Sequence, residues 1–91
     1  MPNFPVLSTT AARDMLQHGA LLIDVRRTAD FNHSHLPGSI SVPFSQLPQQ
    51  ISRLAAPNRA ILLYCAHGIT SHSAALVLAR LGYTRLYIVH P

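Results

Sequence analysis

One stretch of this 91-residue chain decides its fold: Ala60-Ile-Leu-Leu-Tyr-Cys65-Ala-His-Gly-Ile-Thr-Ser71-His-Ser-Ala-Ala-Leu-Val-Leu-Ala-Arg80. An apolar run stops at the chain's only cysteine, crosses a short loop containing Gly68 and gives way to a helical pattern. A buried strand that ends in this way turns the loop N–H groups and the positive end of the helix toward one sulfur atom. Such surroundings lower the pKa of a thiol from about 8.5 to roughly 3.5–7.5. The stretch therefore predicts an activated nucleophile at Cys65.

The rest of the chain repeats this alternation of strand and helix. Unbroken apolar runs are typical of parallel strands that are covered on both faces. We expect strands at residues 4–7, 20–25, 39–42, 60–64 and 85–89, and helices at residues 11–18, at residues 45–54 and from the cysteine loop to about residue 81. Ser8-Thr-Thr10 offers N-caps for the first helix, and Ser45 is the expected N-cap of the second. The pattern indicates a single α/β domain over residues 1–91 with a mainly parallel central sheet.

Composition limits the class of protein. With 48% hydrophobic and 11% charged residues, the chain is typical of a compact globular protein and not of a disordered one. Its apolar runs are too short to span a membrane, and no secretory signal is visible at the start, so we expect no membrane partner. One cysteine excludes an internal disulfide and suits a reducing compartment. We therefore expect a cytoplasmic protein.

The charged residues are unusual, since the chain has seven arginines, no lysine, three aspartates and no glutamate. A net charge of +4 would attract small anions or an acidic partner. The arginines are scattered, however, and we interpret their excess over lysine mainly as codon usage in a GC-rich genome. Because they form no basic stripe with interleaved aromatic residues, we expect no nucleic-acid partner.

Three motifs occur in a recognisable order along residues 8–89. The first is Leu22-Ile-Asp-Val-Arg26 at a strand end, and the second is Asp30-Phe31 followed by Ser34-His-Leu-Pro-Gly-Ser-Ile40. The third, Cys65-Ala-His-Gly-Ile-Thr-Ser71, fits the pattern C-x-x-G-x-[RT]-S. Together and at this spacing, they resemble the rhodanese-like domain in its single-domain sulfurtransferase form.

The resemblance implies a three-layer fold with helices on both faces of the sheet. Asp30, Ser34 and Thr70 stand where the family usually has Glu, Gly and often Arg. The family also continues past its last strand with Gly-Gly and a helix, whereas this chain reads Val89-His90-Pro91. We therefore expect the C-terminal helix to be missing. An apolar sheet face left uncovered in this way would invite homo-oligomer formation.

The resemblance also implies a mechanism, in which the Cys65 thiolate takes the outer sulfur of a small anionic donor such as thiosulfate. The resulting persulfide passes its sulfur to cyanide, a thiol or a protein acceptor, which is covalent ping-pong catalysis. The site would need no cofactor.

Each loop residue has an expected place around this sulfur: Ala66, His67, Gly68, Ile69, Thr70 and Ser71 form the substrate- and persulfide-binding loop. Gly68 allows a left-handed or tightly curved backbone, and the Thr70 hydroxyl can bind the persulfide. The Ser71 hydroxyl can do the same, although we take helix capping as its main role. His67 either borders the pocket, adding positive charge when protonated, or faces solvent.

Three charged residues are assigned structural support. Asp24 is expected to bind backbone N–H groups and fix loop geometry, because a carboxylate close to a thiolate would raise the thiol pKa. Arg26 and Asp30, four residues apart, are expected to form an ion pair. His33, His35 and His67 lack the spacing of zinc ligands, so we expect no metal site.

Two alternatives to a sulfurtransferase enzyme remain open. A phosphatase of this fold would need a longer loop of the form H-C-x5-R, whereas Tyr64 precedes the cysteine here and Ser71 occupies the Arg position. A non-enzymatic persulfide carrier or regulatory binding module would use the same cysteine as the enzyme and differ only in its acceptor. The sequence favours sulfur over phosphate chemistry and leaves donor, acceptor and pathway undetermined.

Overall fold

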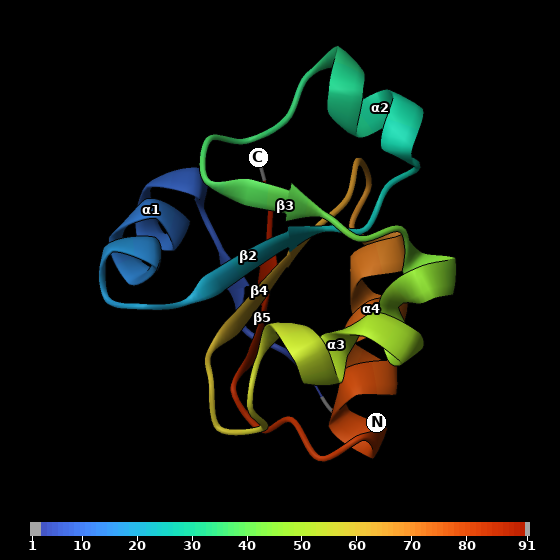
Figure 1. Ribbon diagram of the computed structural model, residues 1–91. Coiled ribbons are helices and arrows are strands. Elements are labelled where there is room, and N and C mark those ends of the chain that lie inside the picture. Colours follow the sequence, from blue (N-terminus) through green and yellow to red (C-terminus); the bar gives the residue numbers. More distant parts are fainter. Residues whose placement is uncertain (1–2, 91) are drawn as a thin grey trace.

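A five-stranded parallel sheet forms the centre of the computed structural model, which describes residues 3–90 (Figure 1). Its strands are β1 (Val6–Leu7), β2 (Leu21–Asp24), β3 (Ser39–Ser41), β4 (Ile61–Tyr64) and β5 (Leu86–Val89). They lie in the order β1-β5-β4-β2-β3, and each neighbouring pair is parallel. The predicted α/β class and parallel sheet are confirmed.

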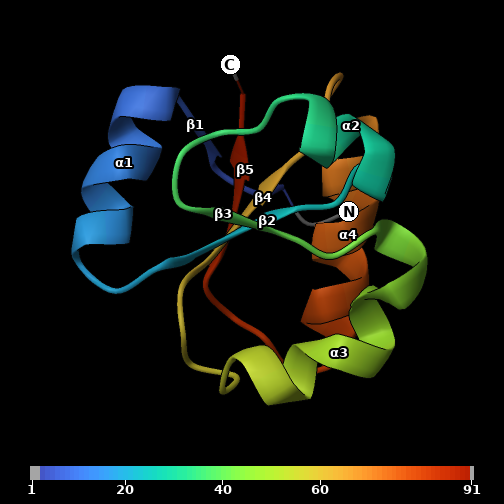
Figure 2. The same ribbon diagram turned by 45° about the horizontal axis from the view of Figure 1, so that its top comes forward.

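Helices cover both faces of this sheet. The helical elements are α1 (Thr9–Gln17), α2 (Thr28–His33), the 3-10 turn η1 (Phe44–Gln46), α3 (Leu47–Leu54) and α4 (Ile69–Arg80). Figure 2 shows α1 on one side of the sheet and α3 with α4 on the other, while α2 lies beyond the ends of the strands. The three-layer arrangement of the rhodanese-like fold is therefore present.

Local sequence explains where most of these elements begin and end. The Ser8 side chain accepts a hydrogen bond from the Ala11 amide at 3.1 Å, so Ser8 is the N-cap of α1 among the predicted candidates Ser8-Thr-Thr10. Ser45 is not a cap, because it lies inside η1, and α3 begins after Gln46 without a side-chain cap. β1 is two residues shorter than expected, since Pro5 has no N–H to donate to a sheet ladder.

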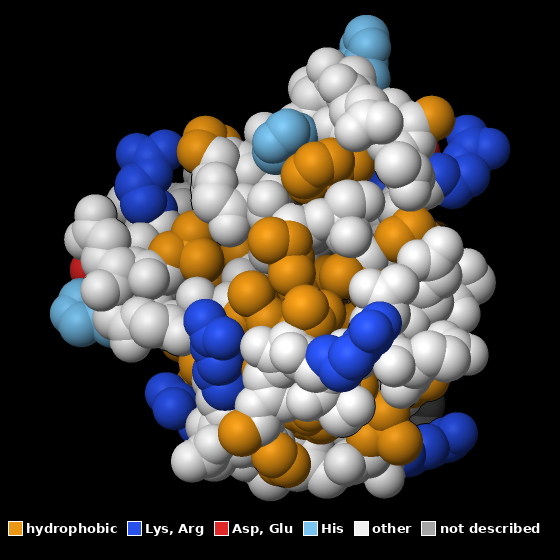
Figure 3. Space-filling view, in the orientation of Figure 1, with side chains coloured by type: hydrophobic (Ala, Val, Ile, Leu, Met, Phe, Trp, Pro, Cys, Tyr) orange, Lys and Arg blue, Asp and Glu red, His pale blue; other side chains and the backbone are white. Residues whose placement is uncertain are grey.

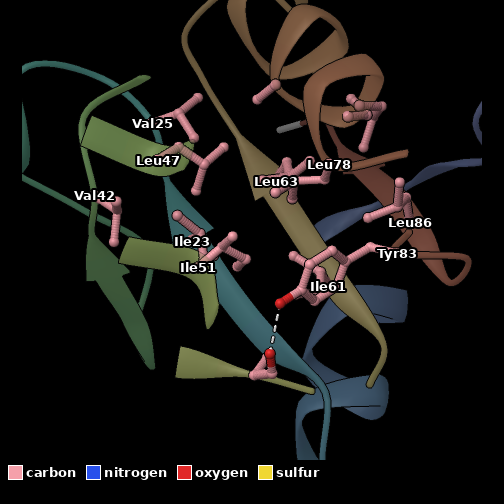
Figure 4. Close-up of a cluster of buried hydrophobic side chains, with 14 of the residues drawn as sticks. Ile23, Val25, Val42, Leu47, Ile51, Ile61, Leu63, Leu78, Tyr83 and Leu86 are labelled. Carbon is pink, nitrogen blue, oxygen red and sulfur yellow. Dashed lines mark hydrogen bonds between the residues drawn. The ribbon is translucent and has the colours of Figure 1, made fainter. Parts of the chain in front are cut away.

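The larger hydrophobic core lies between the sheet and helices α3 and α4 (Figure 4). Ile61 and Leu63 of β4 point into it, and Ile51 and Leu78 reach it from the two helices. The Tyr83 hydroxyl donates a hydrogen bond to the Ala55 carbonyl at 2.6 Å, which ties the end of α3 to the segment after α4. This core fixes β4 and α4 relative to each other, and these are the two elements that flank Cys65.

A smaller cluster under α1 covers the other face of the sheet. Leu22, Leu62 and Val89 are buried there against α1, and the partly buried side chains around them include Tyr64 and Tyr87. None of this cluster is among the exposed large hydrophobic side chains of residues 3–90, which are Val6, Phe44, Ile69 and Leu81. The apolar sheet face that we expected to be uncovered is therefore largely buried under α1, and Tyr64 and Tyr87 are half-buried around it.

Hydrophobic atoms also reach the surface on the face shown in Figure 3, where they gather between α1 and α3 with arginines around them. The edge strand β3 and helix α3 border this area, and Leu21, Ile40 and Leu54 are only half-buried. Among the described residues, no helix is long and apolar enough to cross a membrane.

Candidate active site

Cys65 lies at the carboxyl edge of the sheet, directly after β4. Tyr64, the last residue of β4, is in register with Asp24, the last residue of the neighbouring β2. Ligands of parallel α/β sheets bind outside this edge. The Cys65 side chain is buried, with only 4% of its residue surface exposed.

The loop after Cys65 curls around the sulfur atom. Gly68 has a φ of +77°, the left-handed conformation that its lack of a Cβ allows, and its N–H donates to Cys65 Sγ at 3.1 Å. Helix α4 begins at Ile69, which makes Ser71 its third residue. The first N–H groups of a helix have no partner within the helix, and that of Ser71 donates to Sγ at 3.2 Å. The inward-pointing amides predicted for this loop are therefore present.

Ser71 binds the sulfur through its side chain as well. Its hydroxyl oxygen lies 3.3 Å from Cys65 Sγ, and the Ser71 side chain is fully buried. The prediction that Ser71 mainly caps the helix is wrong, because the N-cap position belongs to Gly68, which offers no side chain. The helix starts at Ile69, three residues before the helical pattern that begins at His72, and this turns Ser71 inward.

These contacts set the protonation of the thiol. Burial raises its pKa, but the bonds from the Ser71 hydroxyl and from the main-chain N–H groups of Ser71, His67 and Gly68 outweigh burial. Together they hold the pKa of Cys65 below its ordinary value of 9.0. The site is therefore built to keep the sulfur as a thiolate, the nucleophilic form of cysteine.

A hollow of about 240 Å³ opens over this sulfur, lined by Cys65, Ala66, His67, Ile69 and Thr70. His67 therefore borders the hollow while remaining exposed, and Thr70 is half-buried. Ile69 is 75% exposed at its rim, an unusual position for an isoleucine that the sequence did not predict. The hollow is large enough for a small inorganic or organic molecule next to the thiolate.

Asp24 and Arg26 form a compact ion pair beside the cysteine loop. Arg26 Nη2 lies 2.8 Å from Asp24 Oδ2, and the Arg26 main-chain N–H donates to Asp24 Oδ1 at 2.9 Å. The hydrogen bond to Asp24 raises the pKa of Arg26 above its already high value. Asp24 thus binds a backbone N–H as predicted, although the loop that it fixes is the one after β2.

The prediction that Arg26 and Asp30 form an ion pair is wrong. Arg26 turns back to Asp24, while Asp30 lies 3.6 Å from the exposed Arg27. Spacing alone misled the prediction, because Arg26 lies before the first turn of α2 and not on its surface. Arg26 also donates to the Ser34 carbonyl at 2.7 Å and lies over the Tyr64 ring at 5.2 Å, contacts that no sequence pattern indicated.

The remaining histidines lie in different surroundings. His72 of α4 is half-buried, and its ring lies edge-on to that of Phe4. His35 stacks on Phe31 with ring centroids 3.8 Å apart. Within residues 3–90, no group of three or more His, Cys, Asp or Glu side chains is arranged to hold a metal ion.

Comparison with known proteins agrees with this geometry. The rhodanese-like domain family matches residues 8–90. Thiosulfate sulfurtransferase GlpE of Haemophilus influenzae (strain PittEE) is 31% identical over 85 residues, which are 93% of this chain and 80% of the relative. The GlpE of Pseudomonas savastanoi pv. phaseolicola is 29% identical over 98% of this chain and 83% of the relative.

Solved structures show the same fold. The human single-domain sulfurtransferase TSTD1 superposes with a TM-score of 0.80 at 23% identity, over 96% of this chain and 89% of the human one. A rhodanese with anions from E. coli gives a TM-score of 0.73 at 27% identity, and the match covers 76% of this chain and 82% of the E. coli one. The chain belongs to the rhodanese-like domain family. Within it, the protein is an enzyme of the rhodanese sulfurtransferase type.

Proposed function

We propose that this protein carries sulfane sulfur from thiosulfate to a thiophilic acceptor through a persulfide on Cys65. The observation that carries the proposal is the convergence on Cys65 Sγ of the Gly68 N–H, the Ser71 N–H and the Ser71 hydroxyl, at 3.1, 3.2 and 3.3 Å. Three polar groups around one buried sulfur stabilise negative charge there, both before and after it gains a second sulfur.

In the first step, the Cys65 thiolate attacks the outer sulfur of thiosulfate. A new S–S bond forms to Cys65, the S–S bond of thiosulfate breaks, and sulfite leaves with the bonding electron pair. The enzyme holds the transferred sulfur as a persulfide anion, and no oxidant or reductant is consumed. Thiosulfate is the donor named for the GlpE relatives, and the E. coli structure contains anions.

In the second step, an acceptor attacks the outer sulfur of the persulfide and releases the Cys65 thiolate. Cyanide leaves as thiocyanate, and a thiolate leaves as a persulfide. The exposed rim at Ile69 and the shallow hollow also suit the thiol of a protein acceptor. A persulfide carrier that serves one protein partner would use the same first step and differ only in this acceptor.

The loop residues have separate parts in this scheme. The amides of Gly68 and Ser71 would hold the charged sulfur, and the hydroxyl of Thr70 at the wall of the hollow would bind the outer sulfur or the donor oxygens. Ala66 and Ile69 form apolar walls. Asp24 and Arg26 hold the neighbouring loop and take no part in the chemistry.

Mass spectrometry of the intact protein tests the proposal. After incubation with thiosulfate and removal of excess donor, the wild-type protein should gain the mass of one sulfur atom and lose it on addition of cyanide. Since Cys65 is the only cysteine, the gain can be assigned without mapping. Cys65→Ser is the matched control and should gain nothing.

Two results would redirect the interpretation. Wild-type protein without a mass gain would contradict the persulfide mechanism. Cys65-dependent hydrolysis of an aryl phosphate would revive phosphatase chemistry, which the loop disfavours because Ser71 stands where a phosphate-binding arginine is needed.

We also propose two properties of the protein in the cell. A single low-pKa cysteine works only while it stays reduced, which supports a reducing compartment such as the cytoplasm. The half-buried Tyr87 beside α1 supports self-association through that margin of the sheet.

A further inference from the structure

The hollow over Cys65 contains little positive charge. Of its described lining residues, Cys65, Ala66, His67, Ile69 and Thr70, only His67 can become a cation. Its side chain is exposed. The amides that bind Cys65 Sγ are already engaged with the sulfur. An incoming anion therefore meets a thiolate, apolar walls, the neutral hydroxyl of Thr70 and one imidazole.

The arginines at this end of the sheet are engaged elsewhere. Arg26 is neutralised by Asp24 at 2.8 Å, and Arg27 lies 3.6 Å from Asp30. The other titratable groups near the loop are two histidines outside the hollow's lining. His72 of α4 has its ring edge-on to Phe4, and His90, after β5, has its Cδ2 3.9 Å from the position of a Cβ built on Gly68.

Charge at this hollow matters because thiosulfate is a dianion and its target is a thiolate. At the few ångströms that separate reacting groups, repulsion between like charges slows the encounter unless a cation lies beside the path. Histidine is the side chain whose charge ordinarily changes between about pH 5 and 8. We propose that His67 selects donors by their charge: its imidazolium form admits dianionic donors, and its neutral form leaves the hollow better suited to weakly charged ones.

This inference rests on the proposed sulfur transfer and adds a residue that sets donor specificity. It predicts two opposing pH effects at one site. Raising the pH forms more Cys65 thiolate and speeds reaction with any electrophile, whereas it removes the His67 charge and disfavours dianions. The profile for thiosulfate should then be bell-shaped, while the profile for a donor of lower charge should mainly rise.

Alkylation separates these two effects. Iodoacetate and iodoacetamide react with the same thiolate: an S–C bond forms, the C–I bond breaks and iodide leaves with the electron pair. Iodoacetate is an anion, whereas iodoacetamide is neutral. The ratio of their rates at Cys65 cancels the titration of the thiol and reports the local charge alone. For the wild-type protein, we expect this ratio to fall about tenfold from about pH 5 to 8.

Variants assign the effect to one residue. His67→Gln should make the ratio low and nearly independent of pH, whereas His72→Gln and His90→Gln should keep the wild-type fall. A constant ratio in the wild type, an unchanged fall in His67→Gln, or a fall lost only in His90→Gln or His72→Gln would each overturn the assignment to His67. A Cys65 that reacts with neither reagent would also overturn it, since the hollow would then admit no small molecule.

Sulfur donors provide the second readout. Methanethiosulfonate is a monoanionic donor whose leaving group is a sulfinate. The ratio of kcat/KM for thiosulfate to kcat/KM for methanethiosulfonate should fall over the same pH range, and His67→Gln should remove this pH dependence. If neither donor forms a persulfide, the proposed function fails, and the alkylation ratio still decides whether His67 controls charge at the hollow.

Discussion

Ser71 contacts Cys65 through two of its atoms, since its main-chain N–H donates to Sγ at 3.2 Å and its hydroxyl oxygen lies 3.3 Å from the same sulfur. The residue can do this because it is the third residue of α4, where the N–H has no helical acceptor and the side chain points into the core. When the thiol ionises, the hydroxyl can rotate to become a donor. The first turn of α4 thus also supplies the groups that activate the cysteine.

Ser71→Ala should therefore weaken the nucleophile without removing the loop amides. Loss of one hydrogen bond to a charged group should raise the pKa of Cys65 and lower its reaction rate with iodoacetamide at neutral pH by about tenfold. Ser73→Ala is the matched control, because Ser73 lies on the same helix and has no such bond to the sulfur. Equal rates in wild type and Ser71→Ala would show that the amides alone set the pKa.

The lowered pKa of Cys65 should also appear as a pH dependence of stability. A group whose pKa is lowered by folding stabilises the folded state fully above its unfolded pKa and loses that contribution as the pH falls through its folded pKa. The free energy of unfolding of the wild type relative to Cys65→Ser should thus rise with pH up to about pH 9 and then level off. Urea unfolding across this range measures it. A difference that stayed constant with pH would mean that the folded and unfolded thiols titrate alike.

Gly68→Ala tests the backbone of the loop. A Cβ at this position meets only His90 Cδ2, at 3.9 Å, so space is available, but a φ of +77° is strained for alanine by about 1–2 kcal/mol. We expect that loss of stability in urea, together with slower persulfide formation, because relief of the strain turns the Gly68 N–H away from Sγ. Gly82→Ala is the control, since Gly82 has a φ of +98° far from the site. It should lose similar stability and keep the rate.

The sequence predicted a mainly parallel sheet and a cysteine at the end of one of its strands because these depend on strong local signals. Apolar runs such as Ile61-Leu-Leu-Tyr64 are too short for a buried helix and follow turn residues such as Pro57-Asn58, which favours buried strands. One cysteine before a glycine and a helix allows few geometries. The inward amides and the left-handed Gly68 followed from the same reasoning. These features are set by residues adjacent in the chain.

The errors arose where the outcome depends on which of two neighbours a side chain selects. Arg26 could pair forward with Asp30 or back with Asp24, and the buried carboxylate of Asp24 needs a partner more than an exposed one does. The role of Ser71 changed because α4 begins at Ile69, three residues before the helical pattern that starts at His72, and helix boundaries are the least reliable part of a prediction from sequence. The exposed Ile69 and half-buried His72 depend on tertiary packing that no spacing rule contains.

Self-association provides a test of the surface beside α1. Tyr87 of β5 is half-buried at the margin of the smaller cluster, and the net charge of +4 is modest for a molecule of this size. We expect sedimentation velocity to show a concentration-dependent shift toward a dimer, and Tyr87→Glu to abolish it by placing a charge there. Phe44→Glu, at an exposed aromatic residue outside the smaller cluster, should leave the shift unchanged. A monomer at every concentration would show that α1 covers this face sufficiently.

The two ion pairs after β2 should contribute very differently to stability. Asp24 is fully buried and Arg26 is only 17% exposed, so Arg26→Gln leaves a buried carboxylate without its cation, which should cost about 3 kcal/mol. Arg27 is 87% exposed, and Arg27→Gln should cost at most about 0.5 kcal/mol because solvent screens its pair with Asp30. Urea unfolding measures both variants under the same conditions. If Arg27→Gln lost as much stability as Arg26→Gln, exposure would not govern the contributions of the two pairs.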